Sequence, residues 1–329
     1  MIASAPGKLI LTGEYAVMEG ALALVVAVDR RAIARRRGDP RSPAFAGSLH
    51  FGPRGTSPFL LAVADEIAAR RGAKDPATAA AMEVAVDSTQ FFEGPLKLGL
   101  GSSAAVTVAA TALALGTADH DEVFAIASAA HARAQGPRGA KGSGADIAAA
   151  VRGGVIAYST SGIERVVWPE DLTLIAFFTG ASADTPTLVA RLQAARHANP
   201  VSVDAALAAI AGASRAACQA CALKGRDLAA TALLSALALA AATMDQLASA
   251  SGIPLVPPCV VAARAALGRL GGTAKTTGAG GGDVAIGVIP GPPGSESAQE
   301  AVRLLTDAGC QPLALSVDQT GVDLHPAAQ

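Results

Sequence analysis

A glycine-rich turn that leads straight into an apolar stretch constrains the fold of this chain more than any other sequence feature. The turn is Gly99-Leu100-Gly101-Ser102-Ser103-Ala104-Ala105, and residues 106–115 continue it with the composition of a helix. Such a turn leaves backbone N–H groups unpaired at the positive end of the helix dipole, where phosphate binds. The sequence therefore predicts a phosphate-binding turn, although Gly-Ser-Ser-Ala is also an ordinary helix cap.

The bulk composition narrows the class of protein. The chain has 329 residues, enough for one large or two medium domains, and its formal net charge of -1 gives no electrostatic basis for binding nucleic acid or an anionic membrane. Cys218 and Cys221 lie in an alanine-rich helical pattern, which favours helix packing over metal or redox chemistry. The first residues lack the pattern of a secretory signal. We therefore expect a soluble, cytoplasmic protein.

The stretch from Leu228 to Met244 is apolar enough to raise the question of a membrane span. It contains serine and threonine, is flanked by Asp227 and Asp245, and barely reaches the length that a bilayer requires. We interpret it as a buried, alanine-rich helix of a soluble domain.

The order of the expected elements gives an α+β fold without internal repeats. The first half mixes strands and helices, with strands expected at 8–12, 23–34 and 82–86 and helices at 59–70, 102–115 and 121–134. The second half continues with a strand at 172–178 and alanine-rich helices at 186–197, 203–223 and 227–249. The composition shift predicts two domains, residues 1–165 and 166–329, with the glycine-rich turns around a cleft between them.

Lysine is rare in this chain, so its positions are informative. Four of the six lysines lie in or beside glycine-rich segments, namely Lys8, Lys97, Lys141 and Lys275. The lysine ammonium is a compact charge that suits a phosphate oxygen. The clustering indicates anion chemistry, with chance placement of a rare residue as the alternative.

Four segments carry the residue types that phosphoryl transfer needs. They are residues 5–11 with Lys8, residues 95–104 with the turn, residues 141–147 with Asp146, and residues 275–283 with a second glycine run. Phosphoryl transfer depends on a phosphate cradle, a divalent metal and a cation at the transferring group. The set predicts a small-molecule phosphotransferase, but one without the Gly-x-x-x-x-Gly-Lys-Ser/Thr signature of P-loop enzymes.

In order and content these segments resemble the superfamily of galactokinase, homoserine kinase, mevalonate kinase and phosphomevalonate kinase, the GHMP kinases. The first family motif resembles residues 5–17, the second residues 95–105 and the third residues 275–283. The resemblance implies an N-terminal domain like domain 2 of ribosomal protein S5 and a C-terminal ferredoxin-like domain. It also implies ATP and Mg²⁺ as cofactors, and a monomer or homodimer with no nucleic-acid or membrane partner.

Finer features resemble the phosphomevalonate kinase branch. Residues 13–17 read Gly-Glu-Tyr-Ala-Val, where mevalonate kinases usually have His in place of Tyr15, and His131 falls about where mevalonate kinases carry a metal-binding Glu. The resemblance implies transfer of the γ-phosphoryl group of ATP to (R)-5-phosphomevalonate. The alternatives are a mevalonate kinase or another hydroxyl kinase of the superfamily, and a non-catalytic metabolite-sensing member.

The resemblance also implies roles for individual residues. Lys8 would offset charge at the transferring group, and Asp146 would orient Lys8 or help to hold the metal. The hydroxyl of Ser102 or Ser103 would face Mg²⁺. The residues implied for the ATP phosphates are Lys97, Gly99, Leu100, Gly101, Ser102, Ser103 and Ala104. Those implied for the acceptor are Tyr15, Lys141, Ser143, Gly144, Arg191, Ala279, Gly280 and Gly281.

Each assignment has a plainer alternative. The alternative for Lys8 is a solvated charge at a strand end, the alternative for Asp146 is a helix cap, and the alternative for His131 is a packed core histidine. Asp283 reads as a strand-end residue of no catalytic consequence. A phosphomonoester has a second pKa near 6, so a phosphate acceptor is mostly ionised at neutral pH and needs no general base.

Overall fold

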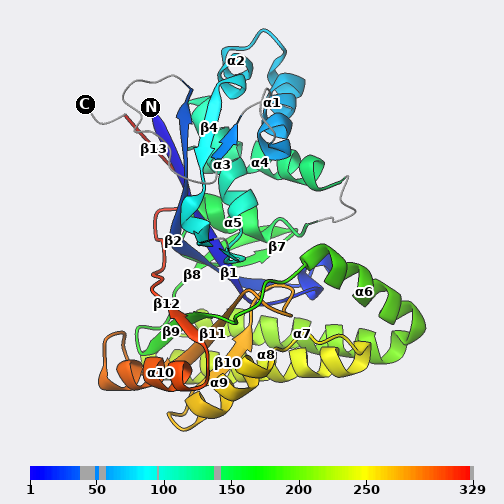
Figure 1. Cartoon of the computed structure of the whole chain (residues 1–329), viewed down its shortest axis with the longest axis vertical. Coiled ribbons are helices and arrows are strands. Elements are labelled where there is room, and N and C mark those ends of the chain that lie inside the picture. Colours follow the sequence, from blue (N-terminus) through cyan, green and yellow to red (C-terminus); the bar gives the residue numbers. More distant parts are fainter. Residues whose placement is uncertain (38–48, 52–56, 95, 137–141, 327–329) are drawn as a thin grey trace.

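The computed structural model describes residues 1–37, 49–51, 57–94, 96–136 and 142–326. Its two main sheets, one of seven strands and one of four, are both antiparallel, and helices cover them (Figure 1). This mixture of helices and sheets confirms the α+β class that the sequence predicts.

The seven-stranded sheet is built around a long second strand. Its order is β13-β1-β2-β4-β3, and β7 and β8 extend it from the other part of β2. Residues 23–26 of β2 pair with β7, whereas residues 33–36 pair with β4. The strands are β1 (Ile2–Thr12), β2 (Ala23–Arg36), β3 (Leu49–Phe51), β4 (Val84–Asp87), β7 (Val155–Ser159), β8 (Gly162–Val166) and β13 (Asp323–His325).

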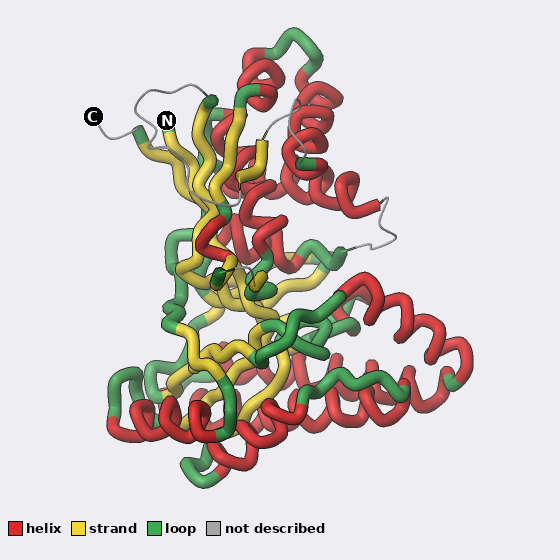
Figure 2. The backbone as a smooth tube through the Cα atoms, viewed as in Figure 1, coloured by secondary structure: helices red, strands yellow, loops and turns green. Residues whose placement is uncertain are grey.

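The α-helices that lie between β3 and β7 in the chain gather on one side of this sheet (Figure 2). They are α1 (Pro58–Arg71), α2 (Pro76–Met82), α3 (Ser102–Leu115), α4 (His120–Gln135) and α5 (Ala145–Arg152). Of these, α3 is apolar on every side and packs against β1, β2 and the other four helices. A helix with no polar face belongs in the core. The glycine-rich turn predicted to bind phosphate therefore leads into a helix of the core.

The four-stranded sheet is covered on both faces. Its order is β10 (Thr273–Thr276), β11 (Val284–Pro290), β9 (Leu172–Phe178) and β12 (Gln311–Leu313). Successive side chains of a strand point to opposite faces. Phe177 accordingly packs with α9 (Pro258–Gly268) and α10 (Glu296–Asp307), whereas Phe178 packs with residues of α7 (Pro200–Cys221) and α8 (Arg226–Ser251). The remaining helix, α6 (Thr185–Ala198), precedes α7.

The helices α7 and α8 are long and apolar enough to cross a membrane, but they pack inside the protein. About half of each apolar window is buried, 44% in α7 and 50% in α8, and the two helices contact each other and both sheets. Leu233, Leu237 and Met244 are fully buried. The interpretation of residues 228–244 as a buried helix is confirmed.

The paired cysteines of α7 are free thiols in a packed environment. Burial raises the pKa of Cys218 to about 11 and that of Cys221 to about 12. Thiols with raised pKa values are poor nucleophiles and metal ligands at neutral pH. The helix-packing interpretation of the two cysteines is confirmed.

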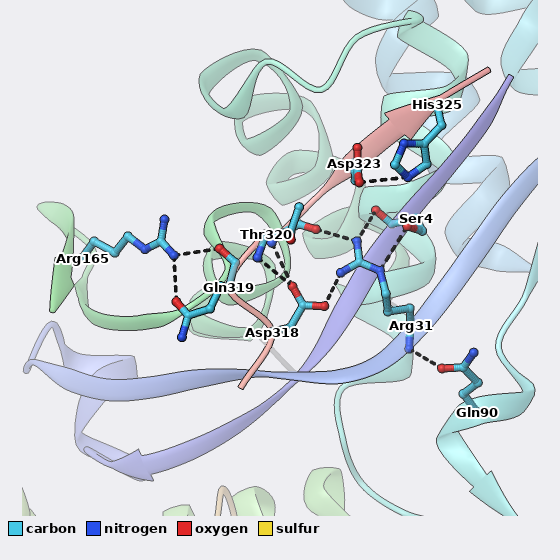
Figure 3. A network of polar contacts seen from close by, with 10 residues as sticks. Ser4, Arg31, Gln90, Arg165, Asp318, Gln319, Thr320, Asp323 and His325 are labelled. Atoms are coloured by element: carbon cyan, nitrogen blue, oxygen red, sulfur yellow. Dashed lines mark hydrogen bonds and ion pairs between the residues drawn. The ribbon is translucent and has the colours of Figure 1, made fainter. Parts of the chain in front are cut away.

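The C-terminal segment returns to the first sheet. Arg31 on β2 donates to the carbonyls of Ser4 and Gly321 (3.1 and 2.6 Å) and forms an ion pair with Asp318 (Figure 3). Arg165 likewise donates to the carbonyl of Gln319 at 2.7 Å. The chain passes from one sheet to the other between β8 and β9, so we propose a domain boundary near residue 165, with β13 belonging to the N-terminal part.

Candidate active site

A cleft of about 410 Å³ brings the predicted segments together. It is lined by residues of β1, the phosphate turn (residues 99–104), the starts of α3 and α5, the loop before α6, and the second glycine turn (residues 278–282). Segments that lie far apart in the sequence thus share one site between the two sheets.

The phosphate turn has the backbone that its glycines predict. Gly99 and Gly101 have φ angles of 73° and 77°, in the left-handed region that glycine adopts without strain. A Cβ atom on Gly101 would lie 3.0 Å from Cγ of Lys8, so the turn also needs glycine for space. No described residue accepts a hydrogen bond from the backbone N–H of Ser102 or Ser103. These N–H groups at a helix start suit an anionic oxygen.

Lys8 lines the cleft, and the stem of its side chain lies against Gly101 of this turn. Its backbone N–H donates to the carbonyl of Leu100 at 2.8 Å, and β1 has a register shift between Pro6 and Gly7 just before it. Burial lowers the pKa of Lys8, and the carboxylates of Asp146 and Asp283 oppose that shift. The described residues offer Nζ no hydrogen-bond or ion-pair partner. A cation held in this way is available to an anionic ligand.

Asp146 lies near a buried histidine. One oxygen of Asp146 accepts from the N–H of Ile147 at 2.9 Å, and the other is 4.0 Å from Nε2 of His131. The same nitrogen is 3.1 Å from Oγ of Ser103, and the ring stacks on Phe59 with 5.3 Å between centroids. His131 is therefore a packed histidine, as one interpretation held, but its polar edge faces the predicted site.

These side chains fit a magnesium–nucleotide complex better than a free metal ion. Mg²⁺ takes oxygen ligands and is usually held by one or two carboxylates together with substrate phosphates. The cleft offers the hydroxyls of Ser102 and Ser103 and the carboxylates of Asp146 and Asp283. Among the described residues no cluster of three or more His, Cys, Asp or Glu side chains forms a metal site.

Three predicted acceptor residues line the cleft: Tyr15, Ser143 and Ala279. The Tyr15 hydroxyl donates to the carbonyl of Ala279 at 2.6 Å, and Tyr15 itself has a left-handed φ of 58°. The carbonyl of Ser143 accepts from the hydroxyl of Tyr158 at 2.6 Å. The Tyr15 side chain thus joins the first family motif to the third.

The other predicted residues fall into two groups. Lys97, Gly99, Gly101, Ser102 and Ser103 line the cleft, whereas Leu100, Ala104, Gly144, Gly280, Gly281 and Arg191 do not. Lys141 lies outside the described residues.

The residues outside the lining have visible structural positions. Leu100 and Ala104 are buried in the core, and Gly144 caps α5 with a φ of 84°. Gly281 donates its N–H to the carbonyl of Leu255 at 2.7 Å, and Gly280 also packs against that carbonyl. Arg191 is exposed on α6.

Sequence reasoning missed two features of the site. Lys275 is fully buried and forms an ion pair with Glu14, which lines the cleft and is also fully buried. Asp283 directly precedes β11, as the strand-end interpretation held, and it also lines the cleft. The clustering of lysines near glycine-rich segments drew attention to Lys275. No local sequence pattern, however, pairs it with Glu14, which lies 261 positions away.

Comparison with known proteins gives a consistent picture. Residues 59–154 match the profile described as GHMP kinases N terminal domain. A mevalonate kinase from Archaeoglobus fulgidus is 31% identical over 92% of this chain and 99% of its own length. A phosphomevalonate kinase from Streptomyces sp. (strain CL190) is 29% identical over 98% of both chains.

Solved structures agree on the fold. The structure of Streptococcus pneumoniae phosphomevalonate kinase in complex with phosphomevalonate and AMPPNP superimposes with a TM-score of 0.73 at 18% identity. The match covers 96% of this chain and 99% of that one. The fold, the cleft built from the three motifs and the full-length relatives together show that this chain belongs to the GHMP kinase superfamily.

Proposed function

We propose that this protein is a phosphomevalonate kinase that uses ATP and Mg²⁺. The observation that carries the proposal is the meeting of the phosphate turn, Lys8 and Asp146 in one cleft. The acceptor is assigned from Tyr15 and His131, the residues by which the sequence resembles that branch, and from the full-length Streptomyces relative. The 31% identity to an archaeal mevalonate kinase favours mevalonate as the second candidate acceptor.

The proposed reaction joins two phosphate groups. An oxygen of the acceptor phosphate attacks the γ-phosphorus of ATP, the bond to the β-γ bridging oxygen breaks, and ADP leaves with that oxygen. The N–H groups of the phosphate turn hold the ATP phosphates, and Lys8 stabilises negative charge on the transferred group. Bound Mg²⁺, held by Ser102 or Ser103 with the phosphates, would supply further charge neutralisation. No general base is required, because the acceptor phosphate is already ionised.

The acceptor is tested by comparing mevalonate with 5-phosphomevalonate in one ATP-consumption assay. We expect turnover with 5-phosphomevalonate and at least about 100-fold lower kcat/KM with mevalonate, because a site built around an ionic group is left with unpaired polar atoms by an acceptor that lacks it. Turnover of mevalonate alone would support the second candidate. Turnover of neither would support a non-catalytic sensor.

Asp146→Asn is expected to lower kcat by about 10- to 100-fold, because loss of a positioning group misplaces the reacting atoms. The amide keeps the shape and the hydrogen bond to Ile147 but loses the charge that acts on Lys8. Steady-state kinetics with matched thermal unfolding curves would check this. A loss of threefold or less would refute both an orienting and a metal-holding role.

We also propose a cytoplasmic enzyme, monomeric or homodimeric, without a nucleic-acid or membrane partner. The net charge of -1 and the packing of α7 and α8 inside the protein support this setting.

A further inference from the structure

Asp283 occupies a backbone position that ordinarily belongs to glycine. It follows Gly278, Gly280 and Gly281, whose φ angles are 61°, 72° and 75°, and its own φ is 56°. A side chain in the left-handed region is strained, and such strain persists where the surroundings hold it and often marks a functional site. Glycine would remove the strain here, so the carboxylate itself needs a reason.

The loop before α6 wraps around this residue. The backbone N–H of Asp283 donates to the carbonyl of Ala181 at 2.7 Å, and the carbonyl of Asp283 accepts from the N–H of Thr179 at 3.0 Å. The side chain adds a third link, because its Oδ1 accepts from the N–H of Ala183 at 3.1 Å. These hydrogen bonds hold residues 179–183 against Asp283. The same loop continues into α6, and its residues 182–186 line the cleft.

The other carboxylate oxygen lies against the phosphate turn. A Cβ atom on Gly99 would come within 2.5 Å of Oδ2 of Asp283, so the turn and the carboxylate are in close contact. Asp283 also acts electrostatically on Lys8 and Lys97, as Asp146 does on Lys8. One side chain thus touches the loop of the second half and the turn of the first, beside the cation of the cleft.

We propose that Asp283 is a positioning residue for phosphoryl transfer: its carboxylate fastens the loop of residues 179–183 to the phosphate turn and, with Asp146, supplies negative charge near the Lys8 ammonium. The inference rests on the proposed kinase function. It gives the third motif a charged side chain, the Asp283 carboxylate, that contacts the reaction centre. The glycines of the same motif only allow its backbone to approach other groups closely.

Two variants separate the charge from the loop contact. Asp283→Asn keeps an oxygen that accepts from Ala183 but removes the charge. Asp283→Gly suits the left-handed backbone and removes both. Asp307→Asn, on the exposed face of α10 and outside the cleft lining, makes the same change of net charge and is the control.

We expect Asp283→Asn to lower kcat by about 10- to 100-fold with KM for ATP within about twofold, because binding is kept while a negative charge that acts on Lys8 is lost. Asp283→Gly should lower kcat at least as far and also increase amide hydrogen exchange of residues 181–185. Asp307→Asn should behave as wild type in both measurements. A kcat of Asp283→Asn within about twofold of wild type would overturn the role of the charge.

The exchange measurement separates this inference from the proposed function, since it needs no substrate. The kinetics use whichever acceptor the wild type turns over. If the wild type used neither mevalonate nor 5-phosphomevalonate, the proposed function would fail, and unchanged exchange in Asp283→Gly would still overturn the inference.

Discussion

Lys8→Met is expected to lower kcat by about 10²- to 10³-fold while the protein stays folded, because a preorganised charge aimed at the transferred group contributes mainly to the transition state. The Lys8 ammonium forms no salt bridge with a described residue, and Asp146 and Asp283 act on it only through longer-range charge, so its loss breaks no ion pair. Lys8→Arg is expected to fail as a rescue. The planar guanidinium of arginine spreads its charge over a fork of donors and cannot place a compact charge where the lysine ammonium does.

The matched control for this prediction is Lys74→Met. Lys74 is exposed between α1 and α2 and does not line the cleft. Its substitution by methionine therefore removes the same positive charge at a position away from the candidate site. Steady-state kinetics and circular dichroism of the three variants would check the expectation. If Lys8→Met kept kcat within threefold of wild type, Lys8 would be only a strand-end charge.

Lys275→Met is expected to lower the free energy of unfolding by about 3–5 kcal/mol, because removal of one partner leaves a buried charge unpaired. Lys275 and Glu14 are 1% exposed each, and the second carboxylate oxygen of Glu14 has no hydrogen-bond partner in the described structure. Burial raises the pKa of Glu14, and Lys275 opposes that shift. Without the lysine only backbone N–H groups offset the desolvation of the carboxylate.

Two further measurements identify this mechanism. In Lys275→Met the folded state holds a proton on Glu14 that the unfolded chain releases above its ordinary pKa of 4.5, so stability should fall as pH rises through the raised value. The deficit against wild type should thus be smaller at pH 5 than at pH 8. Glu14→Gln/Lys275→Met should recover most of the loss, since no buried charge remains. Urea unfolding would measure both, and a double variant no more stable than the single one would contradict the ion-pair explanation.

The local parts of this protein were predictable from sequence because short-range physics determines them. The helix expected at 102–115 matches α3 residue for residue, since a glycine start and an apolar run specify it locally. The strand at 172–178 matches β9 for a similar reason. Helix α2 and strand β13 were not anticipated. The first is only seven residues long, and the second exists through pairing with β1.

The residues of the candidate site likewise include some that the sequence predicted correctly and some that it did not. The phosphate turn, Lys8 and Asp146 were identified from residue types and the family resemblance, and they lie in one cleft. Gly280 and Gly281 were assigned to the acceptor, but they pack against Leu255 outside the lining. A run of glycines predicts that another group packs closely against the backbone, but it does not identify that group.

The sequence alone determined the α+β class, the phosphate turn and its helix, and the kinase superfamily, because these depend on patterns within a few residues. Only the tertiary structure decided which groups meet across long distances: Glu14 with Lys275, His131 with Ser103, and Asp283 with Gly99. Burial and charge pairing depend on the whole packed chain, and no local pattern records them. The local sequence thus specifies the phosphate turn, whereas the tertiary fold decides which side chains surround it.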